Sequence, residues 1–420
     1  MTDTLDAVFR REAGRCTATL IRVLGDIDLA EDAVAEAFVI AAEQWPKRGI
    51  PPNPGGWITT TARNRAIDRL RRESTRVERY IAAHRMHTCD TEPDPTPEDE
   101  DLDRFVDVVP DDQLRLMFLC CHPALAADAQ VALTLRLLGG LETSEIASAF
   151  LLPEATTAQR IVRAKRKLRH NHAPYRIPGA AELPDRLHAV LASIYLIYTE
   201  GHTATAGVAL TRVDLSTEAI RLGRVLATLM PDEPEVIGLL ALMLLTETRR
   251  SARVDADGSM VRLADQDRAR WNPNLIEEGH GLVRACLRRN QPGPFQIQAA
   301  IAAVHSDAPT ATDTDWSQIV ALYDQLYAIQ PNPVVALNRA VAVGAVDGPS
   351  AGLDALATVD LGDYQPYHAA RADLLIRAGH TDEAIAAYDR AIELTATSAE
   401  REFLSRQRQR AATTPHGPHG

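Results

Sequence analysis

The chain has 420 residues, five cysteines and a formal net charge of −12. An acidic balance of this size argues against a protein that binds nucleic acid over its whole surface, so contact with a polyanion requires a local basic patch. None of the cysteines forms a Cys-x-x-Cys pair, so neither a disulfide framework nor a zinc cluster is indicated. The length is sufficient for two or three domains with separate cores.

Helical periodicity dominates the sequence. Alanine, leucine, arginine and glutamate recur at helical spacing nearly throughout, whereas β-branched runs with period-two alternation are scarce. We therefore predict an all-α protein. No signal peptide precedes the first polar residues and no apolar run is long enough to cross a bilayer, so we expect a cytoplasmic protein without membrane contact.

The first distinctive segment, residues 26–38, is rich in carboxylates. They follow one another along an expected helix and are Asp26, Asp28, Glu31, Asp32 and Glu36. One interpretation is a solvated helix start, because negative charge is favourable near a helix N-terminus. The other is a surface that meets a basic partner.

Residues 54–76 predict a helix with two different faces. Apolar residues recur at helical spacing on one face, and arginines recur at i, i+4, i+7 and i+11 on another. The apolar residues are Ile58, Ala62, Ala66, Ile67 and Leu70, and the arginines are Arg65, Arg69, Arg72 and Arg76. In an acidic chain, this basic stripe predicts contact with a polyanion. Asp68 is placed to pair with Arg72 at i, i+4.

Trp57 stands at the start of the same helix and has two interpretations. An aromatic ring beside arginines can stack on unpaired bases while the arginines bind phosphates. An indole next to Ile58 can instead anchor the helix in the core, and we favour this role for Trp57 itself.

Residues 81–106 separate two basic parts of the chain. The stretch from Asp90 to Asp103 is proline-rich and acidic and has no apolar run, which is typical of a disordered linker. We therefore predict a flexible tether between a helical domain at 5–80 and a second one at 107–172.

Residues 141–169 have the pattern of a helix-turn-helix. Leu152 and Pro153 separate a short helix from a longer one. The longer helix is expected to turn Ile161, Val162, Ala164 and Leu168 inward. It presents hydroxyl, amide and guanidinium groups that suit base edges and phosphates, namely Thr156, Thr157, Gln159, Arg160 and Arg163. An ordinary helical hairpin with a charged outer face is the alternative.

Residues 180–411 predict a further helical domain, followed by a disordered tail at 412–420. From Tyr367 onward the sequence resembles one tetratricopeptide repeat, with small residues where two helices touch and an aromatic residue that fills the gap. These positions are Ala372, Ala384, Tyr388 and Ala391, and a weaker copy precedes them at 338–356. Stacked repeats of this kind form a concave surface that binds peptides or neighbouring domains.

Residues 253–279 lack the helical spacing of apolar residues that the rest of this half of the chain shows. Polar groups gather there beside an indole, at Asp265, Gln266, Asp267, Arg268, Arg270 and Trp271. A calcium loop is excluded by spacing, because glycine falls at the fourth place rather than the sixth. The segment is either a structural insert whose charges pair internally or a regulatory contact with the rest of the chain or with a ligand.

Residues 5–172 resemble the extracytoplasmic-function (ECF) class of the sigma-70 family. The resemblance rests on Asp28–Phe38, on Trp57 with the 62–72 segment, and on 145–147 with 159–164. In that family a region 2 helical domain binds core RNA polymerase and the promoter's minus-10 element, and a region 4 helix-turn-helix reads the minus-35 element. The C-terminal half resembles that of the ECF subgroup in which a fused tetratricopeptide-like domain regulates sigma activity.

The resemblance implies a role for each set of residues. Polymerase contacts are implied for Asp28, Glu31, Asp32, Glu36 and Phe38. Minus-10 contacts are implied for Trp57, Arg63, Asn64, Arg65, Arg69, Arg71, Arg72 and Arg76. Minus-35 contacts are implied for Thr156, Thr157, Gln159, Arg160, Arg163, Lys165 and Arg166.

The expected function is transcription initiation. The protein would bind core RNA polymerase, place it on promoter DNA and hold the opened strand, while the C-terminal domain tunes this activity and receives a peptide or protein partner. No phosphate loop, metal-spaced cluster or nucleophile triad emerges, so we expect neither an enzyme nor a cofactor. Two rivals remain: a helix-turn-helix regulator that acts without polymerase, and a helical scaffold that responds to a ligand or peptide.

Overall fold

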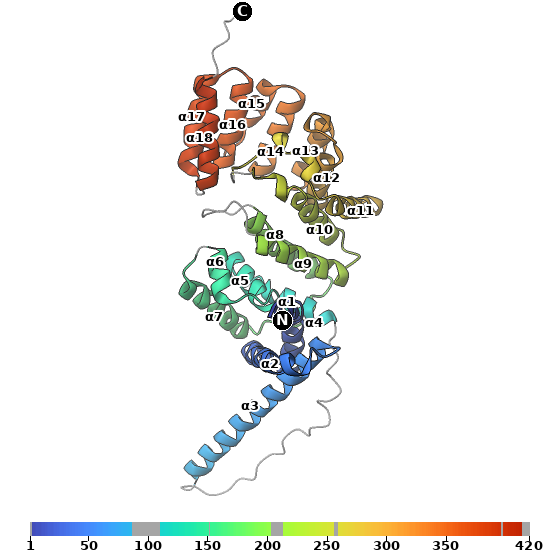
Figure 1. Cartoon of the computed structure of the whole chain (residues 1–420), viewed down its shortest axis with the longest axis vertical. Helices are drawn as coiled ribbons and strands as arrows, with labels where there is room; N and C mark the ends of the chain where they lie inside the picture. The colour runs from blue at the N-terminus through green and yellow to red at the C-terminus, as the bar shows by residue number, and fades with distance from the viewer. Residues whose placement is uncertain are drawn as a thin grey trace, which may run out of the picture. The chain divides into compact units, whose positions relative to one another are not determined.

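The computed structural model describes residues 2–85, 110–150, 152–202, 213–255, 259–395 and 398–413. These residues are mainly helical, and the β-contact found among them is an isolated bridge between Val254 and Met260. The prediction of an all-α protein is confirmed (Figure 1). Within the same ranges, no helix combines the length and apolar character needed to cross a bilayer. The chain divides into two compact units, Met1–Ser193 and Ile194–Gly420.

The first unit contains two groups of helices, α1–α3 and α4–α7, and the beginning of α8. Their bounds are α1 (Thr2–Leu24), α2 (Ile27–Arg48), α3 (Pro54–Arg85), α4 (Pro110–Cys120), α5 (Ala127–Leu137), α6 (Thr143–Ala149), α7 (Glu154–His170) and α8 (Leu183–His202). Helix α3 includes residues 81–85 of the expected linker. Residues 86–106 of that linker lie outside the described residues.

Local sequence explains where α2 begins. Gly25 adopts a positive φ of 70°, which allows the sharp turn between α1 and α2. The next residue, Asp26, is the N-cap and accepts a hydrogen bond from the backbone N–H of Leu29 at 2.8 Å. Asp26 is therefore used to start the helix.

A buried polar seam joins the two helix groups of the first unit. Its centre is Asp112 of α4, whose carboxylate is 1 % exposed and accepts hydrogen bonds from Arg22 Nε of α1 and Arg115 Nη1, both at 2.8 Å. The hydroxyl of Tyr175 donates to the carbonyls of Ala18 at 2.7 Å and Asp112 at 3.0 Å. Burial raises the pKa of Tyr175, so the phenol stays a donor.

Close backbone packing accompanies this seam. A Cβ atom on Gly14 of α1 would lie 2.7 Å from the carbonyl oxygen of Leu138, so only glycine permits this approach. The two groups therefore pack directly against each other, in addition to being connected through the 81–106 segment.

The second unit continues with α9–α18. The α-helix bounds are α9 (Val213–Leu229), α10 (Pro234–Glu247), α11 (Pro273–Arg289), α12 (Pro294–Asp307), α13 (Trp316–Ile329), α14 (Pro333–Val346), α15 (Pro349–Leu356), α16 (Gln365–Arg377), α17 (Thr381–Leu394) and α18 (Ser398–Thr413). Short 3₁₀ turns are η3 (Arg250–Ala252), η4 (Leu263–Asp265), η5 (Arg268–Arg270) and η6 (Ala311–Asp313). Proline opens α10, α11, α12, α14 and α15, where its missing N–H costs nothing.

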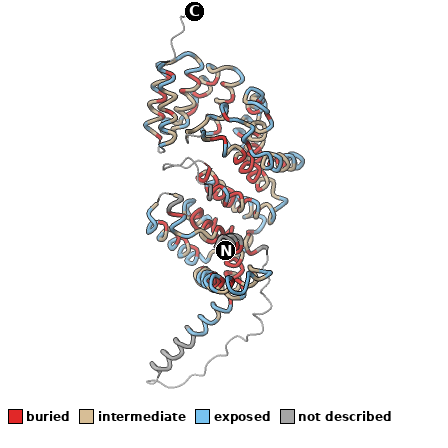
Figure 2. The backbone as a smooth tube through the Cα atoms, in the orientation of Figure 1, coloured by how far each residue is buried: buried red, intermediate tan, exposed pale blue. Residues whose placement is uncertain are grey.

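The positions assigned to a tetratricopeptide-like repeat share one core. Ala372 of α16 and Ala384, Tyr388 and Ala391 of α17 are buried in the same apolar cluster. Buried residues are the red parts of the tube in Figure 2. This packing agrees with the expected contact of small residues between paired helices, and the assignment to that repeat family stays a prediction. Helix α18 ends at Thr413, and residues 414–420 of the expected tail lie outside the described residues.

A buried polar cluster connects α8, α9 and α10 in the second unit. Tyr198 Oη lies 3.3 Å from both His202 Nδ1 and Glu247 Oε2, and Ser216 Oγ donates to Glu247 Oε1 at 3.2 Å. Glu247 Oε2 is 3.5 Å from His202 Nδ1, which favours a charged imidazole. Burial and the charges of nearby arginines act more strongly in the other direction and lower the pKa of His202 to about 2.

We expect the second unit to lose stability as the pH falls below about 6.5, the ordinary pKa of histidine. In that range the unfolded chain binds a proton at His202 that the folded chain excludes, so each pH unit costs about 1.4 kcal/mol. Calorimetry between about pH 7 and pH 5 measures this slope. His202→Asn should reduce the slope by about 1.4 kcal/mol per pH unit, and a further part should remain because burial lowers the pKa of His305 to about 4. The exposed His380→Asn should leave the slope unchanged, and equal slopes in all three proteins would contradict the explanation.

Candidate nucleic-acid interface

Helix α3 has buried apolar residues and exposed polar residues, but they do not lie on opposite faces. Ile58, Ala62 and Ala66 are buried. Arg69, seven residues after Ala62 and therefore on nearly the same side, is exposed and pairs with Asp32 of α2, and other polar residues of the helix are exposed as well. The exposed ones are Asn64, Arg65, Arg69, Arg71 and Arg72. Arg72 Nε donates to the backbone carbonyl of Asp68 at 3.1 Å, in place of the expected carboxylate pair.

Three residues of α3 depart from the expected pattern. Arg63 is only 8 % exposed, whereas Leu70 is 45 % exposed and does not join the core. Trp57 is half-buried and packs edge-on against Trp45 of α2, with ring centroids 5.5 Å apart, as expected of an anchor. The side chain of Arg76 lies outside the described residues.

Helices α6 and α7 form the helix-turn-helix pair. The inward stripe of α7 is Thr157, Ile161, Ala164 and Leu168, all buried. Thr157 was predicted to face DNA, and this prediction was wrong. Its side chain points inward, is 1 % exposed and donates a hydrogen bond from its hydroxyl to the carbonyl of Pro153 at 3.4 Å.

The outward face of α7 is polar with one apolar residue. Thr156, Gln159, Arg163 and Arg166 are exposed, and Arg163 Nη2 donates to Gln159 Oε1 at 3.5 Å. Val162 was expected to point inward, but it is 61 % exposed because it lies about 100° round the helix from the buried Ile161. Arg160 is half-buried and pairs with Asp128 of α5 at 3.1 Å.

Two exposed valines are functional candidates that the sequence reasoning missed. Val162 stands among Gln159, Arg163 and Arg166, and Val39 of α2 is 60 % exposed, three residues after Glu36. The available signal was their spacing, which places each on the outer face of its helix.

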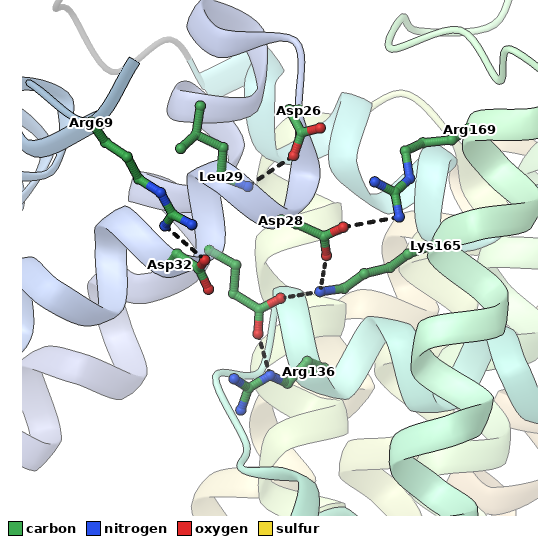
Figure 3. Close-up of polar contacts among 9 residues, drawn as sticks. Asp26, Asp28, Leu29, Asp32, Arg69, Arg136, Lys165 and Arg169 are labelled. Atoms are coloured by element: carbon green, nitrogen blue, oxygen red, sulfur yellow. Dashed lines mark hydrogen bonds and ion pairs between the residues drawn. The ribbon is translucent and has the colours of Figure 1, made fainter. Parts of the chain in front are cut away.

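The acidic residues at the start of α2 are already paired inside the first unit (Figure 3). Lys165 Nζ of α7 lies 2.8 Å from Asp28 Oδ1 and 2.5 Å from Glu31 Oε2. Arg169 Nη2 of α7 lies 3.1 Å from Asp28 Oδ2, and Arg136 of α5 donates to Glu31. Asp28 and Glu31, which were expected to face polymerase, therefore contact basic side chains of α7 and α5.

Lys165 is the centre of this contact. Its side chain is 11 % exposed and that of Glu31 is 17 % exposed. Burial by itself would lower the pKa of Lys165, but the charges of Glu31 and Asp28 outweigh it and raise that pKa. Lys165 is therefore held as a cation against α2 and does not lie on the outward face with Gln159.

The remaining acidic positions of α2 behave differently. Asp32 Oδ2 accepts from Arg69 Nη1 of α3 at 3.1 Å, and Glu36 is exposed. Phe38 is 7 % exposed and packs edge-on against Phe9 with ring centroids 4.7 Å apart. Phe38 thus serves the core, contrary to the surface role implied for it.

The polar segment at 265–271 makes contacts within the second unit. The guanidinium of Arg268 donates to the carbonyl of Ala308 at 2.6 Å and lies over the Trp271 ring, 4.9 Å from its centroid. Trp271 and Gln266 are buried, at 5 % and 8 % exposure. These residues therefore pack inward.

The other charges of this segment are also used locally. Asp265 accepts from Arg262 Nε at 2.7 Å, and Asp267 caps η5 through its own side chain. Arg270 donates to the carbonyl of Ser251, whose hydroxyl donates back to the Arg270 carbonyl at 2.7 Å. Internal pairing, one of the two interpretations of the segment, accounts for these contacts.

Three protein families match successive parts of the chain. Residues 8–76 match sigma-70 region 2, residues 115–168 match sigma-70 region 4, and residues 186–287 match a family of unknown function, DUF6596. The two sigma-70 matches cover the helices with the basic faces described above. No solved structure matches the chain.

Relatives agree with this division. The chain is 41 % identical over 420 residues to the uncharacterized protein R00370 of Rhizobium meliloti (strain 1021), a match that covers 99 % of this chain and 98 % of that protein. It is 26 % identical over 196 residues to the probable ECF RNA polymerase sigma factor SigI of two Mycobacterium tuberculosis strains, CDC 1551 and H37Rv, covering 46 % of this chain and 62 % of SigI. The chain therefore belongs to the same family as R00370 and, through its region 2 and region 4 domains, to the sigma-70 family.

Proposed function

We propose that this protein is an ECF-class sigma factor that binds core RNA polymerase and directs it to promoters. Region 2 binds polymerase through α2 and holds the opened minus-10 strand along the exposed arginines of α3. Region 4 reads the minus-35 element with the outward face of α7. SigI, which matches part of this chain, is named as a probable factor of this class.

One observation carries the proposal. In a chain of net charge −12, exposed guanidinium groups are concentrated on the outer faces of two helices, α3 and α7. Each helix belongs to a sigma-70 region, and each presents cations for phosphates next to groups suited to bases. Local basic faces of this kind overcome the unfavourable overall charge.

Core-dependent promoter opening tests the proposal. Purified core RNA polymerase from the source organism is mixed with the full-length chain on DNA fragments upstream of its own gene. We expect opening only when both proteins are present, and loss of opening on the double charge reversal Arg69→Glu with Arg72→Glu. Absence of binding to core polymerase, combined with tight specific binding of duplex DNA by the free chain, would instead establish a stand-alone regulator.

Val162 is expected to contact an apolar base edge. Its exposed side chain lies among the polar groups of α7, and a valine there suits the C5-methyl group of thymine. Val162→Ala should cost about 1 kcal/mol, roughly fivefold, at one thymine of the minus-35 element. Holoenzyme binding to fragments with single substitutions measures this effect; the same loss at every position would rule out a local contact.

We further propose that residues 194–420 tune promoter activity, through a protein or peptide partner bound by the helical repeats or through the 265–271 segment. The support is their size and their division into a separate compact unit. A chain truncated after Ser193 should differ from the full chain in the rate or specificity of promoter opening. Equal rates and specificities under all tested conditions would refute this role.

A further inference from the structure

Basic side chains from several elements of the second unit act on one another. Arg249 and Arg253 flank the 3₁₀ turn η3, and Arg268 belongs to η5. The charges of Arg253 and Arg249 both act on His202 of α8, and those of Arg249 and Arg268 both act on His305 of α12. Arg249 therefore lies within electrostatic reach of both histidines.

Two of these arginines are held by backbone carbonyls. Arg253 donates to the carbonyl of His202, and Arg268 donates to the carbonyls of His305 and, at 2.6 Å, of Ala308. A carbonyl is a neutral acceptor, so these hydrogen bonds fix the guanidinium groups without cancelling their charge. The result is a group of positioned cations.

Arg249 is the unpaired member of the group. It is half-buried, and its guanidinium makes no ion pair or hydrogen bond with any residue that the structure describes. The next residue, Arg250, is balanced by Glu247. Burial, followed by the charge of Arg249, lowers the pKa of Arg253 to about 10, so the two cations disfavour each other. A half-buried cation beside another cation costs stability until an anion binds to it.

His202 adds a buried hydrogen-bond acceptor to these cations. The Tyr198 hydroxyl donates to Glu247 Oε2, and Nδ1 of His202 lies 3.3 Å from that hydroxyl oxygen and 3.5 Å from Oε2. Two oxygens beside Nδ1 require it to carry the proton of the neutral ring, which leaves Nε2 as an acceptor. The side chain is 8 % exposed, and Nε2 has no partner among the described residues.

The backbone holds His202 in this position. A Cβ atom on Gly201 would lie 2.2 Å from the backbone nitrogen of Ser216, so α8 and α9 touch immediately before His202. Ser216 Oγ in turn donates to Glu247 Oε1 at 3.2 Å. The acceptor is therefore fixed before any ligand arrives, which reduces the entropy lost on binding.

We propose that this cluster is a binding site for the phosphate group of a small molecule. Arg249 donates to two phosphate oxygens, because its planar guanidinium matches their spacing. His202 Nε2 accepts a hydrogen bond from a protonated phosphate oxygen. Arg253 and Arg268 supply a positive field that favours a group with more than one negative charge. A phosphate fits better than a carboxylate, because it carries up to two charges and retains a proton near neutral pH.

The site is independent of the proposed function. His202 and the three arginines lie within residues 186–287, the part that matches a family of unknown function, and His305 follows it. None of these residues belongs to sigma-70 region 2 or region 4. Binding is measured on the protein without polymerase or DNA, so either proposal can fail without the other.

Calorimetry of the full-length protein at pH 7 tests the site. Inorganic phosphate, glycerol 3-phosphate and sulfate are compared at equal ionic strength, adjusted with sodium chloride. At 100 times its dissociation constant, phosphate should raise the ratio of folded to unfolded second unit about 100-fold. Tighter binding of glycerol 3-phosphate identifies a phosphate ester as the preferred ligand, and tighter binding of inorganic phosphate identifies the free ion. No stabilisation by any anion, or stabilisation of the first unit alone, overturns the site.

Substitution of Arg249 separates a binding role from a structural one. Arg249→Gln should weaken phosphate binding by about 10–100-fold, because a hydrogen bond to a charged group is lost. Without phosphate this variant should be at least as stable as the wild type, because an unbalanced cation has been removed. Arg288→Gln removes an exposed arginine of α11 and should change neither property. A large loss of stability in Arg249→Gln without phosphate would assign Arg249 to folding and overturn the proposal.

Sulfate tests the role of His202. Sulfate carries no proton at pH 7, so it cannot donate to Nε2 and should bind about tenfold more weakly than phosphate. His202→Asn retains a donor near the position of Nδ1 and removes Nε2, so it should bind the two anions alike. Equal affinities of the wild type for phosphate and sulfate would overturn the hydrogen bond to His202.

Discussion

Replacing Asp112 by alanine should lower the free energy of unfolding of the first unit by about 3 kcal/mol. The carboxylate is 1 % exposed and neutralises Arg22 and Arg115, whose side chains are 21 % and 28 % exposed. Without it, both arginines lose a buried carboxylate partner. Calorimetry of the full-length protein should show the transition of this unit about 6–12 °C lower, with that of residues 194–420 unchanged.

Two further variants show whether burial is the cause. Asp128 of α5 pairs with Arg160 but its side chain is 56 % exposed, so Asp128→Ala should cost less than about 1 kcal/mol. Asp112→Asn retains one oxygen acceptor and should fall between the two. Equal losses for Asp112→Ala and Asp128→Ala would show that the seam does not depend on a buried charge.

Simultaneous replacement of Gln159 and Arg163 by alanine should weaken holoenzyme binding to its minus-35 element by roughly 10²–10³-fold. This expectation rests on the proposed function. Both side chains are exposed on α7 and hydrogen-bonded to each other at 3.5 Å, which positions them side by side for base edges. Each bidentate contact to a base contributes about 1–3 kcal/mol of discrimination. Binding to promoter fragments with the native and a scrambled minus-35 sequence measures the loss.

Arg166→Ala provides the comparison on the same helix. A phosphate contact carries no sequence information, so its removal should weaken both fragments alike and reduce the salt slope by about 1. The double variant Gln159→Ala/Arg163→Ala should weaken binding chiefly to the fragment with the native minus-35 sequence. If Gln159→Ala/Arg163→Ala weakened binding to both fragments equally, α7 would not read bases through these two residues.

Periodicity was a reliable guide to which residues of a helix are buried. Ile58, Ala62 and Ala66 are buried, as the spacing in α3 predicts, but Arg69 lies on nearly the same side and is exposed, paired with Asp32. In α7, two assignments were wrong although the spacing was informative. Thr157 is buried because it stands at i, i+4, i+7 and i+11 with Ile161, Ala164 and Leu168, and Val162 is exposed because it lies about 100° round the helix from Ile161.

Resemblance to a family was a weaker guide to individual side chains. Phe38 and Arg63 occupy motif positions, yet both are buried, because a motif records residue identity and not which neighbour covers it. The seam at Asp112 had no signal in the sequence. Arg22 and Tyr175 are separated from Asp112 by 90 and 63 residues, and no local spacing relates them.

The sequence by itself determined the helical fold, the basic faces of α3 and α7, and the two sigma-70 regions, because each depends on residues within one or two turns of each other. Only the tertiary structure decided that region 2 and region 4 pack together and that Asp28 and Glu31 bind Lys165. Lys165 lies 134 or more residues from Asp28 and Glu31 in sequence, and helical periodicity does not encode which distant helices pack together.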